Sequence, residues 1–210
     1  MTNKKTTLLL IDGNNLFHRA YHGLPPLSDK SGENANAVFG FSNMLLKSID
    51  EIKPYYIACA FDTKAPTFRH VEFQAYKAQR KAPPPDLYPQ LPKVKKVLDA
   101  FGIKFFEKAG YEADDLLASV ATKFLDEVDD VIILSGDRDL LQMVDDKIKV
   151  QAPGWNQPAG RQGLKDATLF GSAEVMAKYG ISPDQMVDWK AIVGDPSDNC
   201  LLYTSDAADE

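Results

Sequence analysis

Three short apolar stretches decide the fold: TLLLID at residues 7–12, YYIACAFD at residues 55–62 and VIILS at residues 131–135. Each is an apolar run that ends in a turn signal, which is typical of a buried β-strand. Weaker strand candidates lie at residues 103–106 and 148–150. Helical patterns lie between and after them, at residues 35–51, 87–101, 112–127, 138–144, 172–179 and 183–193. Strands that alternate with helices predict an α/β fold with a central, mostly parallel sheet flanked by helices.

The composition narrows the class of protein. The chain has 210 residues, 44% of them hydrophobic and 26% charged, as in a globular protein of about one domain. No apolar run approaches the roughly 20 residues of a membrane-spanning helix, and residues 8–11 are too short a run for a signal peptide. Two cysteines, Cys59 and Cys200, cannot form a disulfide scaffold. We therefore expect a cytoplasmic protein with reduced thiols and no membrane partner.

Carboxylates follow the predicted strands at the points where the strands end. Asp12 closes the first strand, Asp62 closes the second, and Asp137 and Asp139 follow the third. The carboxyl ends of parallel strands share one edge of a sheet, where open α/β folds bind their ligands. Two further groups are Glu112, Asp114 and Asp115 at a predicted helix start, and Asp195 and Asp198 in the sequence GDPSDN. The sequence therefore predicts one rim with nine candidate carboxylate ligands.

Nine clustered carboxylates would repel one another and would need cations. Oxygen ligands select hard ions such as Mg²⁺ or Mn²⁺, and several carboxylates can hold two ions about 3.5–4 Å apart, the geometry of in-line phosphoryl displacement. Taken alone, each group is better explained as a turn residue or a helix cap. Their convergence on one rim favours a site with two ions. The histidines His18, His22 and His70 do not pair at metal-ligand spacing, so we expect structural or phosphate-contacting roles for them.

A basic and aromatic segment follows the second strand. The net charge is −6, but residues 64–108 carry ten Lys or Arg against four acidic residues. Within residues 63–81, basic and aromatic side chains alternate: Lys64, Arg69, Lys77, Arg80 and Lys81 with Phe68, Phe73 and Tyr76. A solvated amphipathic helix would account for this composition. The alternative is a segment that contacts phosphates and whose aromatic rings stack on unpaired bases.

Five motifs, in this order and spacing, resemble the family of 5′–3′ exonucleases and flap endonucleases, and in particular the 5′-nuclease domain at the N-terminus of bacterial DNA polymerase I. They are IDGNNLFHRAYHGLPP at residues 11–26, AFDTKAPTFRHVEFQAYKAQRKAPPPDL at 60–87, GYEADDLLAS at 110–119, ILSGDRDLLQ at 133–142 and VGDPSDN at 193–199. The resemblance covers about residues 5 to 199. It implies a PIN-like α/β nuclease fold with a basic helical arch at about residues 63–85.

The resemblance also implies a mechanism and a substrate. The same nine carboxylates would hold two Mg²⁺ or Mn²⁺ ions. Arg19, Arg69, Lys77 and Arg80 would contact phosphates, with Lys77, Arg80 and Arg19 taking part in catalysis, and Tyr76 or a nearby Phe would stack on a displaced base. The substrate would be DNA with a 5′ end, flap or nick, including RNA–DNA primer junctions, in replication and repair. The protein would act as a monomer, with a polymerase domain in the parent chain.

Two stretches depart from the family pattern. Residues 1–199 are expected to form the nuclease domain, whereas residues 200–210 (CLLYTSDAADE) stand where the family has a helix–hairpin–helix. Residues 152–169 are less like the family than their surroundings. Two alternative functions stay open: a structure-specific DNA-binding fragment with weak or no turnover, and a PIN-like ribonuclease. The basic, aromatic segment speaks against the ribonuclease, because a compact PIN domain needs no such insertion.

Overall fold

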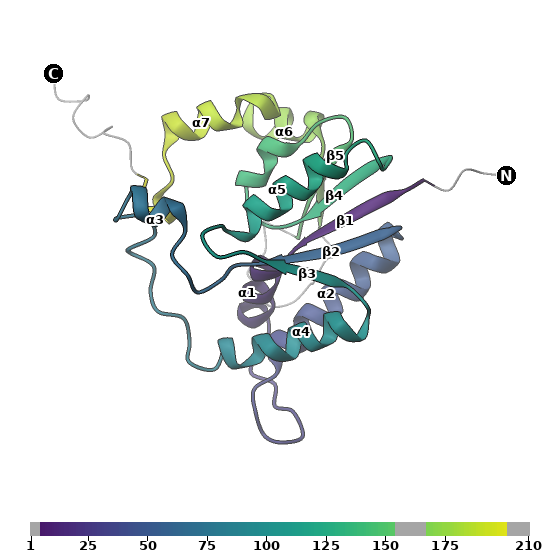
Figure 1. Cartoon of the computed structure of the whole chain (residues 1–210), viewed down its shortest axis with the longest axis vertical. Coiled ribbons are helices and arrows are strands. Elements are labelled where there is room, and N and C mark those ends of the chain that lie inside the picture. Colours follow the sequence, from purple (N-terminus) through teal and green to yellow (C-terminus); the bar gives the residue numbers. More distant parts are fainter. Residues whose placement is uncertain (1–4, 154–166, 201–210) are drawn as a thin grey trace.

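A six-stranded sheet forms the centre of the protein in a computed structural model that describes residues 5–153 and 167–200 (Figure 1). The strand order is β3-β2-β1-β4-β5-β6, and only β6 runs antiparallel to its neighbour. The strands are β1 (Thr7–Asp12), β2 (Tyr56–Phe61), β3 (Lys104–Glu107), β4 (Asp130–Leu134), β5 (Ile148–Ala152) and β6 (Thr168–Phe170). The predicted mostly parallel sheet is confirmed, and each of the five predicted strands lies in it.

β1 lies at the middle of the sheet and is buried along its whole length. Leu9 pairs with Ile57 of β2 on one side and with Ile132 of β4 on the other. Leu9 and Ile11 pack into one hydrophobic cluster, whereas Leu8 and Leu10 pack into another. Strands covered on both faces need no polar positions, which is why this stretch is a continuous apolar run.

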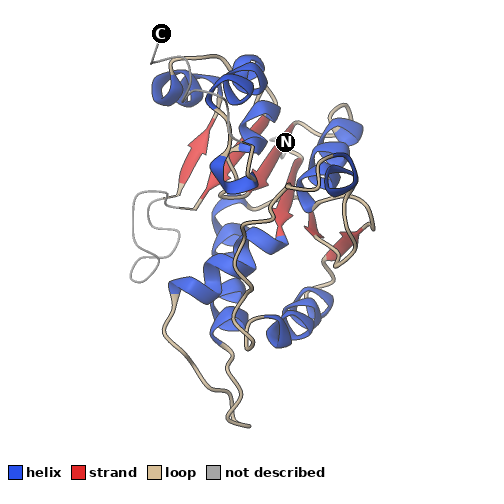
Figure 2. Ribbon diagram, turned by 90° about the vertical axis from the view of Figure 1, so that its left-hand side faces the viewer, coloured by secondary structure: helices blue, strands red, loops and turns tan. Residues whose placement is uncertain are grey.

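Helices cover both faces of the sheet, so the molecule has three layers (Figure 2). Below the sheet in Figure 1 lie α1 (Gly13–Gly23), α2 (Asn36–Ile52) and α4 (Leu91–Ala100), which bury Phe17, Phe41 and Leu98 against it. On the other face lie α5 (Ala113–Phe124), α6 (Ser172–Tyr179), α7 (Met186–Val193) and the 3-10 helix η2 (Asp139–Met143). Their buried side chains include Leu117, Leu141 and Val175.

The structure differs from the predicted elements in five places. α1 was not predicted, because the sequence GNN at its start has low helix propensity. In place of the α-helix predicted at residues 138–144, the structure has the 3-10 helix η2. The helix predicted at residues 183–193 is divided into a 3-10 turn, η4 (Pro183–Gln185), and α7, and the one at 87–101 into η1 (Tyr88–Gln90) and α4. β6 was also missed, because three residues give no alternating pattern.

The predicted helical arch is helical over only five residues, α3 (Phe68–Glu72), and turns follow it. The segment instead crosses to the C-terminal end of the described chain, next to the 3-10 helix η5 (Pro196–Asp198) (Figure 1). The Lys77 N–H donates to the Asp198 carbonyl at 3.1 Å, and the Asn199 amide donates to the Ala75 carbonyl at 2.9 Å. These contacts join segments more than a hundred residues apart in the sequence.

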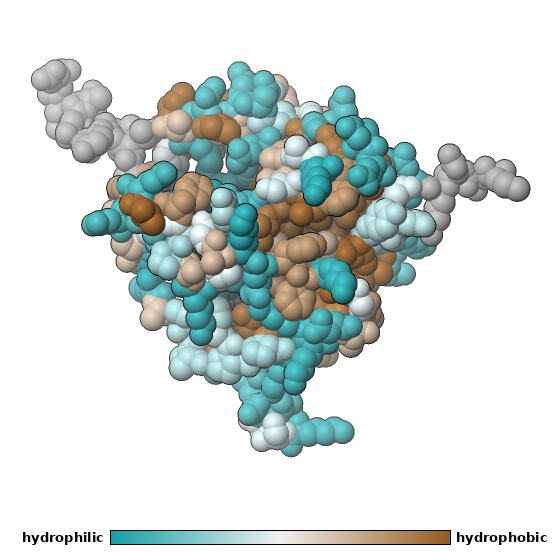
Figure 3. Space-filling model, in the orientation of Figure 1, coloured by the Kyte–Doolittle hydropathy of each residue, from teal (hydrophilic) through white to brown (hydrophobic). Residues whose placement is uncertain are grey.

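Apolar side chains gather in the middle of the face seen in Figure 3, over the edge strand β3 and between α4 and α5. Phe106 of β3 is one of the exposed large apolar residues. Among the described residues, no helix is long and apolar enough to cross a bilayer. Cys59 is buried and Cys200 is exposed, and both are free thiols. The departures at residues 152–169 and 200–210 fall largely outside the described residues.

Candidate active site

A cleft of about 750 Å³ opens at the C-terminal ends of β1 and β2 and beside the loop that follows β4. The chain builds β2 and β3 on one side of β1 and then β4 and β5 on the other, so the strand order reverses between β1 and β4. Ligands of open α/β sheets bind in the crevice at such a switch point. The cleft is lined by Asp12, Asn14, Asn15, His18, Arg19, His22, Asp62, Lys77, Arg80, Lys81, Ala82, Pro83, Tyr88, Glu112, Ala113, Asp114, Gly136 and Asp137.

Asp12 is fixed at the switch point by groups from both flanking segments. Its Oδ1 accepts from the Asn15 N–H at 2.9 Å, which caps α1, and its Oδ2 accepts from the Ser135 hydroxyl at 2.7 Å. The Gly136 N–H in turn donates to the Asn15 side chain at 2.9 Å. Asp12 is only 6% exposed, and burial raises its pKa to about 7 in spite of these hydrogen bonds. A cation bound at Asp12 would therefore stabilise its charged form.

Asp62 and Glu112 connect β2 with the start of α5. Asp62 accepts from the Asn14 side chain at 2.6 Å and from the Ala113 N–H at 2.7 Å. Glu112 is the N-cap residue of α5, and its carboxylate accepts from the Lys77 ammonium at 2.8 and 2.9 Å. These contacts bring a strand end, a helix start and the basic segment to one side of the cleft.

Asp114 and Asp115, in the first turn of α5, meet different environments. Burial, together with the charges of Asp115 and Glu112, raises the pKa of Asp114 to about 6. Asp115 instead accepts two hydrogen bonds from the Arg69 guanidinium, both 2.8 Å, and the bonds to Arg69 hold its pKa below its usual value. Asp114 lines the cleft, whereas Asp115 serves as the anchor of Arg69 and as the partner of the Glu112 N–H.

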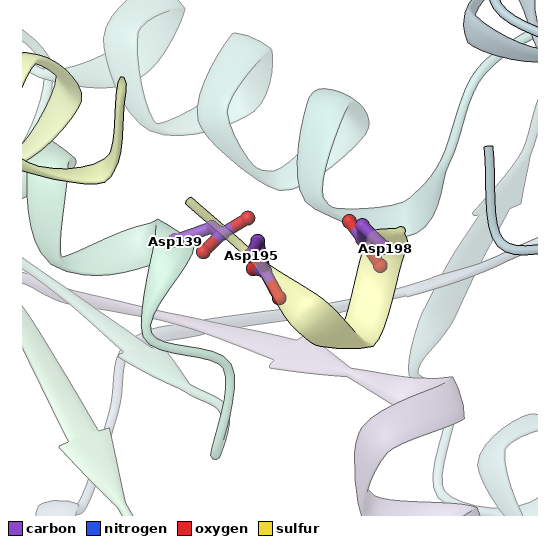
Figure 4. A group of neighbouring side chains, drawn as sticks. All are labelled: Asp139, Asp195 and Asp198. Atoms are coloured by element: carbon purple, nitrogen blue, oxygen red, sulfur yellow. The ribbon is translucent and has the colours of Figure 1, made fainter. Parts of the chain in front are cut away.

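Asp139, Asp195 and Asp198 form an acidic triad beside the cleft. Each offers a carboxylate oxygen, and these oxygens lie within 4.8 Å of one another. In Figure 4, Asp139 and Asp195 lie close together, and Asp198 lies farther along η5. Lys190 of α7 contacts both Asp139 and Asp195. Burial raises the pKa of Asp195, but hydrogen bonds from Lys190 and Ser197 outweigh it and hold the pKa at about 2.

The nine predicted carboxylates thus fall into three sets. Five line the cleft: Asp12, Asp62, Glu112, Asp114 and Asp137. Asp139, Asp195 and Asp198 form the acidic triad, and Asp115 is engaged by Arg69. Burial raises the pKa of Asp137, and the charges of Asp198 and Asp195 act on it in the same direction, so the cleft and the triad are electrostatically coupled.

The basic residues predicted to contact DNA are distributed unevenly. Arg19, Lys77, Arg80 and Lys81 line the cleft, and the Arg80 guanidinium donates to Asp198 at 2.7 Å. Lys64 and Arg69 do not line it. The cleft therefore brings four predicted cations and five predicted carboxylates together.

Tyr76 does not have the exposure that base stacking requires. It is 7% exposed, and its hydroxyl donates to Glu112 at 3.1 Å and to Asp198 at 3.2 Å. The stacking role expected of Tyr76 or a nearby Phe stays a prediction, and the covered ring of Tyr76 is less suited to it than an exposed Phe ring. Phe68 and Phe73 of the same segment are 42% and 44% exposed.

Two histidines and several polar residues also lie in or beside the cleft. His18 and His22 line the cleft, and the His18 ring lies 3.4 Å from the Tyr88 hydroxyl, whereas His70 completes the cap of α3 with Thr67. Sequence reasoning missed Asn14, Asn15, Ser135, Tyr88 and Lys190. The first three lie within the quoted motifs and could have been found there, but nothing in the spacing of Lys190 indicates its partners.

The donor set fits a hard divalent cation. The cleft and the acidic triad present carboxylate oxygens, and neither a cysteine nor a histidine belongs to the triad. Burial, with a smaller contribution from neighbouring carboxylates, raises the pKa values of Asp12, Asp114 and Asp137, so a bound divalent cation would stabilise their charged forms. Such sites suit Mg²⁺ or Mn²⁺ rather than softer metals.

Comparisons with known proteins agree with this geometry. Residues 7–180 match the family model of the 5′-3′ exonuclease, N-terminal resolvase-like domain. DNA polymerase I of Bacillus subtilis is 39% identical over 199 residues, and that of Mycobacterium leprae is 42% identical over 197 residues. These alignments cover 95% and 93% of this chain, but the chain spans only about a fifth of each relative's length (22% and 21%).

Solved structures share the fold. The 5′-exonuclease of bacteriophage T5, solved with bound zinc ions, superposes with a TM-score of 0.69 at 20% identity, over 92% of this chain and 68% of that one. Human GEN1, solved with Holliday junction DNA, superposes with a TM-score of 0.54 at 14% identity, over 93% of this chain and 45% of that one. The family model and the curated relatives together establish that the chain belongs to the 5′–3′ exonuclease family of nuclease domains.

Proposed function

We propose that this chain is a Mg²⁺- or Mn²⁺-dependent 5′-nuclease that hydrolyses DNA phosphodiester bonds at 5′ ends, flaps and nicks. The observation that carries the proposal is the shared cleft, in which Arg19, Lys77, Arg80 and Lys81 face the carboxylates of Asp12, Asp62, Glu112, Asp114 and Asp137. A surface with cations alone would bind phosphates without cutting them, and a surface with carboxylates alone would repel them. Both together suit a site that binds a phosphodiester and hydrolyses it.

The carboxylates of the cleft and of the acidic triad would hold the ions. When bound, two such ions lower the pKa of water and stabilise the leaving oxygen of an in-line displacement. The chain supplies the orientation: Asn15 and Ser135 fix Asp12, and Asn14 fixes Asp62. Partners of this kind keep ligand oxygens in place and are commonly worth 10- to 100-fold in metal affinity or activity.

Lys77 and Arg80 would bind the scissile phosphate and stabilise the charge that develops on it. Both side chains reach the edge of the cleft, where they contact Glu112 and Asp198. A cation placed where charge develops in the transition state commonly supplies several kcal/mol. Arg19, on the face of α1 toward the cleft, would hold a neighbouring phosphate.

The basic segment would guide the 5′ single strand past the cleft. Its exposed rings, Phe68 and Phe73, take over the stacking role expected of Tyr76, since stacking on an aromatic ring tolerates any base. The contacts of Lys77 and Arg80 with Asp198 and Ser197 support such a path. Primer removal in replication and repair, at RNA–DNA junctions as well as at DNA flaps, would follow from such a path.

Cleavage of a 5′-labelled flap DNA tests the proposal. We expect cutting near the flap junction with Mg²⁺, none with EDTA, and none by Asp137→Asn, which keeps the size of the side chain and removes its charge. Structure-selective binding in a gel shift without any metal-dependent cutting would favour a DNA-binding fragment instead. Cutting of single-stranded RNA in preference to the flap would favour a PIN-like ribonuclease.

The relatives suggest the setting in which this activity would operate. Since the chain spans about a fifth of the length of the DNA polymerase I relatives, we infer that a polymerase domain belongs to the parent protein. The nuclease would then act as a monomeric unit in the cytoplasm, on the DNA ends that the polymerase meets. Co-purification of polymerase activity with the full-length protein tests this part of the proposal.

A further inference from the structure

Lys190 lies where carboxylate oxygens converge. Its ammonium group is 2.6 Å from Asp195 Oδ2 and also contacts Asp139 Oδ1. The two acids come from different elements, η2 and the loop before η5, and Figure 4 shows their carboxylates close together. Oxygens of Asp139, Asp195 and Asp198 lie within 4.8 Å of one another. The ammonium group therefore lies beside oxygens that a cation of the acidic triad would use.

We propose that Lys190 is a built-in counter-ion of the acidic triad, which holds Asp139 and Asp195 together and which a divalent cation must displace. The inference rests on the metal dependence of the proposed function. One ammonium group brings a single positive charge to two carboxylates, whereas a divalent ion brings two. Both cations need the same oxygen lone pairs, so binding of one opposes binding of the other.

The surroundings of Lys190 permit this exchange. Its side chain is 24% exposed, so Lys190 is in contact with solvent rather than enclosed in the core. Met186 and Trp189 pack α7 against the core, while Ile192 and Val193 near its end are 71% and 55% exposed. A lysine has a flexible four-carbon stem and can move its charge without moving the helix. Lys190 would thus set how much divalent metal the site needs, without itself touching the substrate.

Mn²⁺ binding separates this role from a purely structural one. Free Mn²⁺ is measured by electron paramagnetic resonance during titration of the wild-type chain, of Lys190→Met and of Lys190→Arg. We expect Lys190→Met to bind Mn²⁺ about three- to tenfold more tightly, which is the range expected for removing a competing, partly exposed ion pair. Lys190→Arg retains the cation and should keep the wild-type affinity.

Lys95→Met is the matched control. Lys95 is 23% exposed and lies 2.6 Å from Glu107, so it resembles Lys190 in burial and pairing but lies outside the cleft and the acidic triad. Its removal should leave Mn²⁺ affinity unchanged.

Thermal unfolding is a second measurement of the role of Lys190. In EDTA, Lys190→Met should unfold at a lower temperature than the wild type, and saturating Mn²⁺ should remove this difference. Lys95→Met should show the same deficit with and without Mn²⁺.

The outcomes are distinct. Weaker or equal Mn²⁺ binding by Lys190→Met overturns the inference and leaves the proposed function intact. Binding of no Mn²⁺ by either the wild type or Lys190→Met overturns both. Tighter binding by Lys190→Met alone, with the temperature gap closed by Mn²⁺, supports the counter-ion role whether or not flap cleavage has been detected.

Discussion

The ammonium group of Lys77 lies 2.8 and 2.9 Å from the two carboxylate oxygens of Glu112, 35 residues away in the sequence. The Lys77 backbone has a φ of 55°, a left-handed conformation that few residues other than glycine adopt. Such a conformation costs about 1–3 kcal/mol and persists where surrounding contacts enforce it, most often at functional sites. Here the Lys77 N–H bond to Asp198 enforces it and directs the side chain to the cleft.

Replacing Lys77 with Met should reduce flap cleavage by about 10²–10³-fold, because a charged group at the reacting phosphate is lost. Affinity for the flap should fall much less, since Arg19, Arg80 and Lys81 also line the cleft. Single-turnover cleavage and fluorescence anisotropy measure the two effects separately. Lys96→Met, which removes an exposed lysine from α4, is the control and should cut normally. Equal rates for the two variants would refute the role of Lys77.

Stability in EDTA should depend on pH through Asp12. Its pKa is about 7 in the folded protein and 3.8 in the unfolded chain, so the folded state binds more protons between these values. The free energy of unfolding should therefore fall as pH rises from about 4 to about 7. Asp12→Asn, which keeps a capping side chain, should be more stable than the wild type at pH 8 by about 2–4 kcal/mol.

That advantage should disappear near pH 4 and should shrink when Mg²⁺ is added, and Asp12→Asn should not cleave DNA. Urea unfolding at a series of pH values, with and without Mg²⁺, measures the difference in unfolding free energy between Asp12→Asn and the wild type. A constant difference between Asp12→Asn and wild type over the whole pH range would mean that Asp12 is ionised throughout.

Tyr76→Phe distinguishes packing from base stacking. The variant keeps the ring but loses the hydroxyl that donates to Glu112 and Asp198, so we expect a loss of about 1–2 kcal/mol in stability and slower cleavage. If the ring stacked on DNA, Phe would substitute for it without cost. Chemical unfolding measures the stability of Tyr76→Phe, and flap cleavage measures its activity. Phe73→Ala removes a more exposed ring and should weaken DNA binding instead.

Arg69 and Asp115 should show strong coupling. Their paired 2.8 Å hydrogen bonds join α3 to the first turn of α5, and both side chains are less than a third exposed. Arg69→Gln and Asp115→Asn should each cost about 1–3 kcal/mol, and the double variant should cost little more than either. Urea unfolding of the wild type, the two single variants and the double variant gives the coupling energy between Arg69 and Asp115. Additive losses would show that Arg69 is available for DNA rather than committed to Asp115.

Gly13→Ala should distort the cleft. A Cβ at Gly13 would lie 2.4 Å from Cε1 of the buried Phe61 ring, so either α1 or the end of β2 has to move. We expect a loss of about 1–3 kcal/mol, as for other overpacked cores, and slower cleavage, because Asp12 and Asp62 flank this contact. Gly171→Ala is the control, since its Cβ would meet only the flexible Glu174 side chain at 3.1 Å. Thermal unfolding compares the stability of Gly13→Ala with that of Gly171→Ala.

The strands and the position of the carboxylates were accessible from the sequence for a topological reason. A buried parallel strand must be a continuous apolar run, and an acid that closes such a run must lie on the common rim, as Asp12 and Asp62 do. The side chains that pair with each acid could not be predicted from the sequence. Asp115 meets Arg69 and Asp139 meets Lys190 across 46 and 51 residues, and charge spacing carries no information on such pairs.

The basic segment also makes long-range contacts that its local sequence pattern does not predict. Its alternation of cations and aromatic rings predicted exposed contacts with DNA, and Arg80 and Lys81 do line the cleft. Tyr76 differs because a turn, rather than a long helix, follows α3 and carries its ring inward to Glu112 and Asp198. Burial of a single ring depends on contacts with residues 36 and 122 positions away, which no local pattern encodes.

The central position of β1 has a consequence for synthesis on the ribosome. Thr7–Asp12 is made first, and β2 can pair with it early, but its other edge stays open until residues 130–134 have emerged. Pairings this far apart in the chain close slowly. The acidic triad is completed later still, when residue 198 appears. If the acidic triad holds metal as we propose, a nascent chain lacks a complete set of ligands, and cleavage of nucleic acid has to wait until Asp198 has left the exit tunnel.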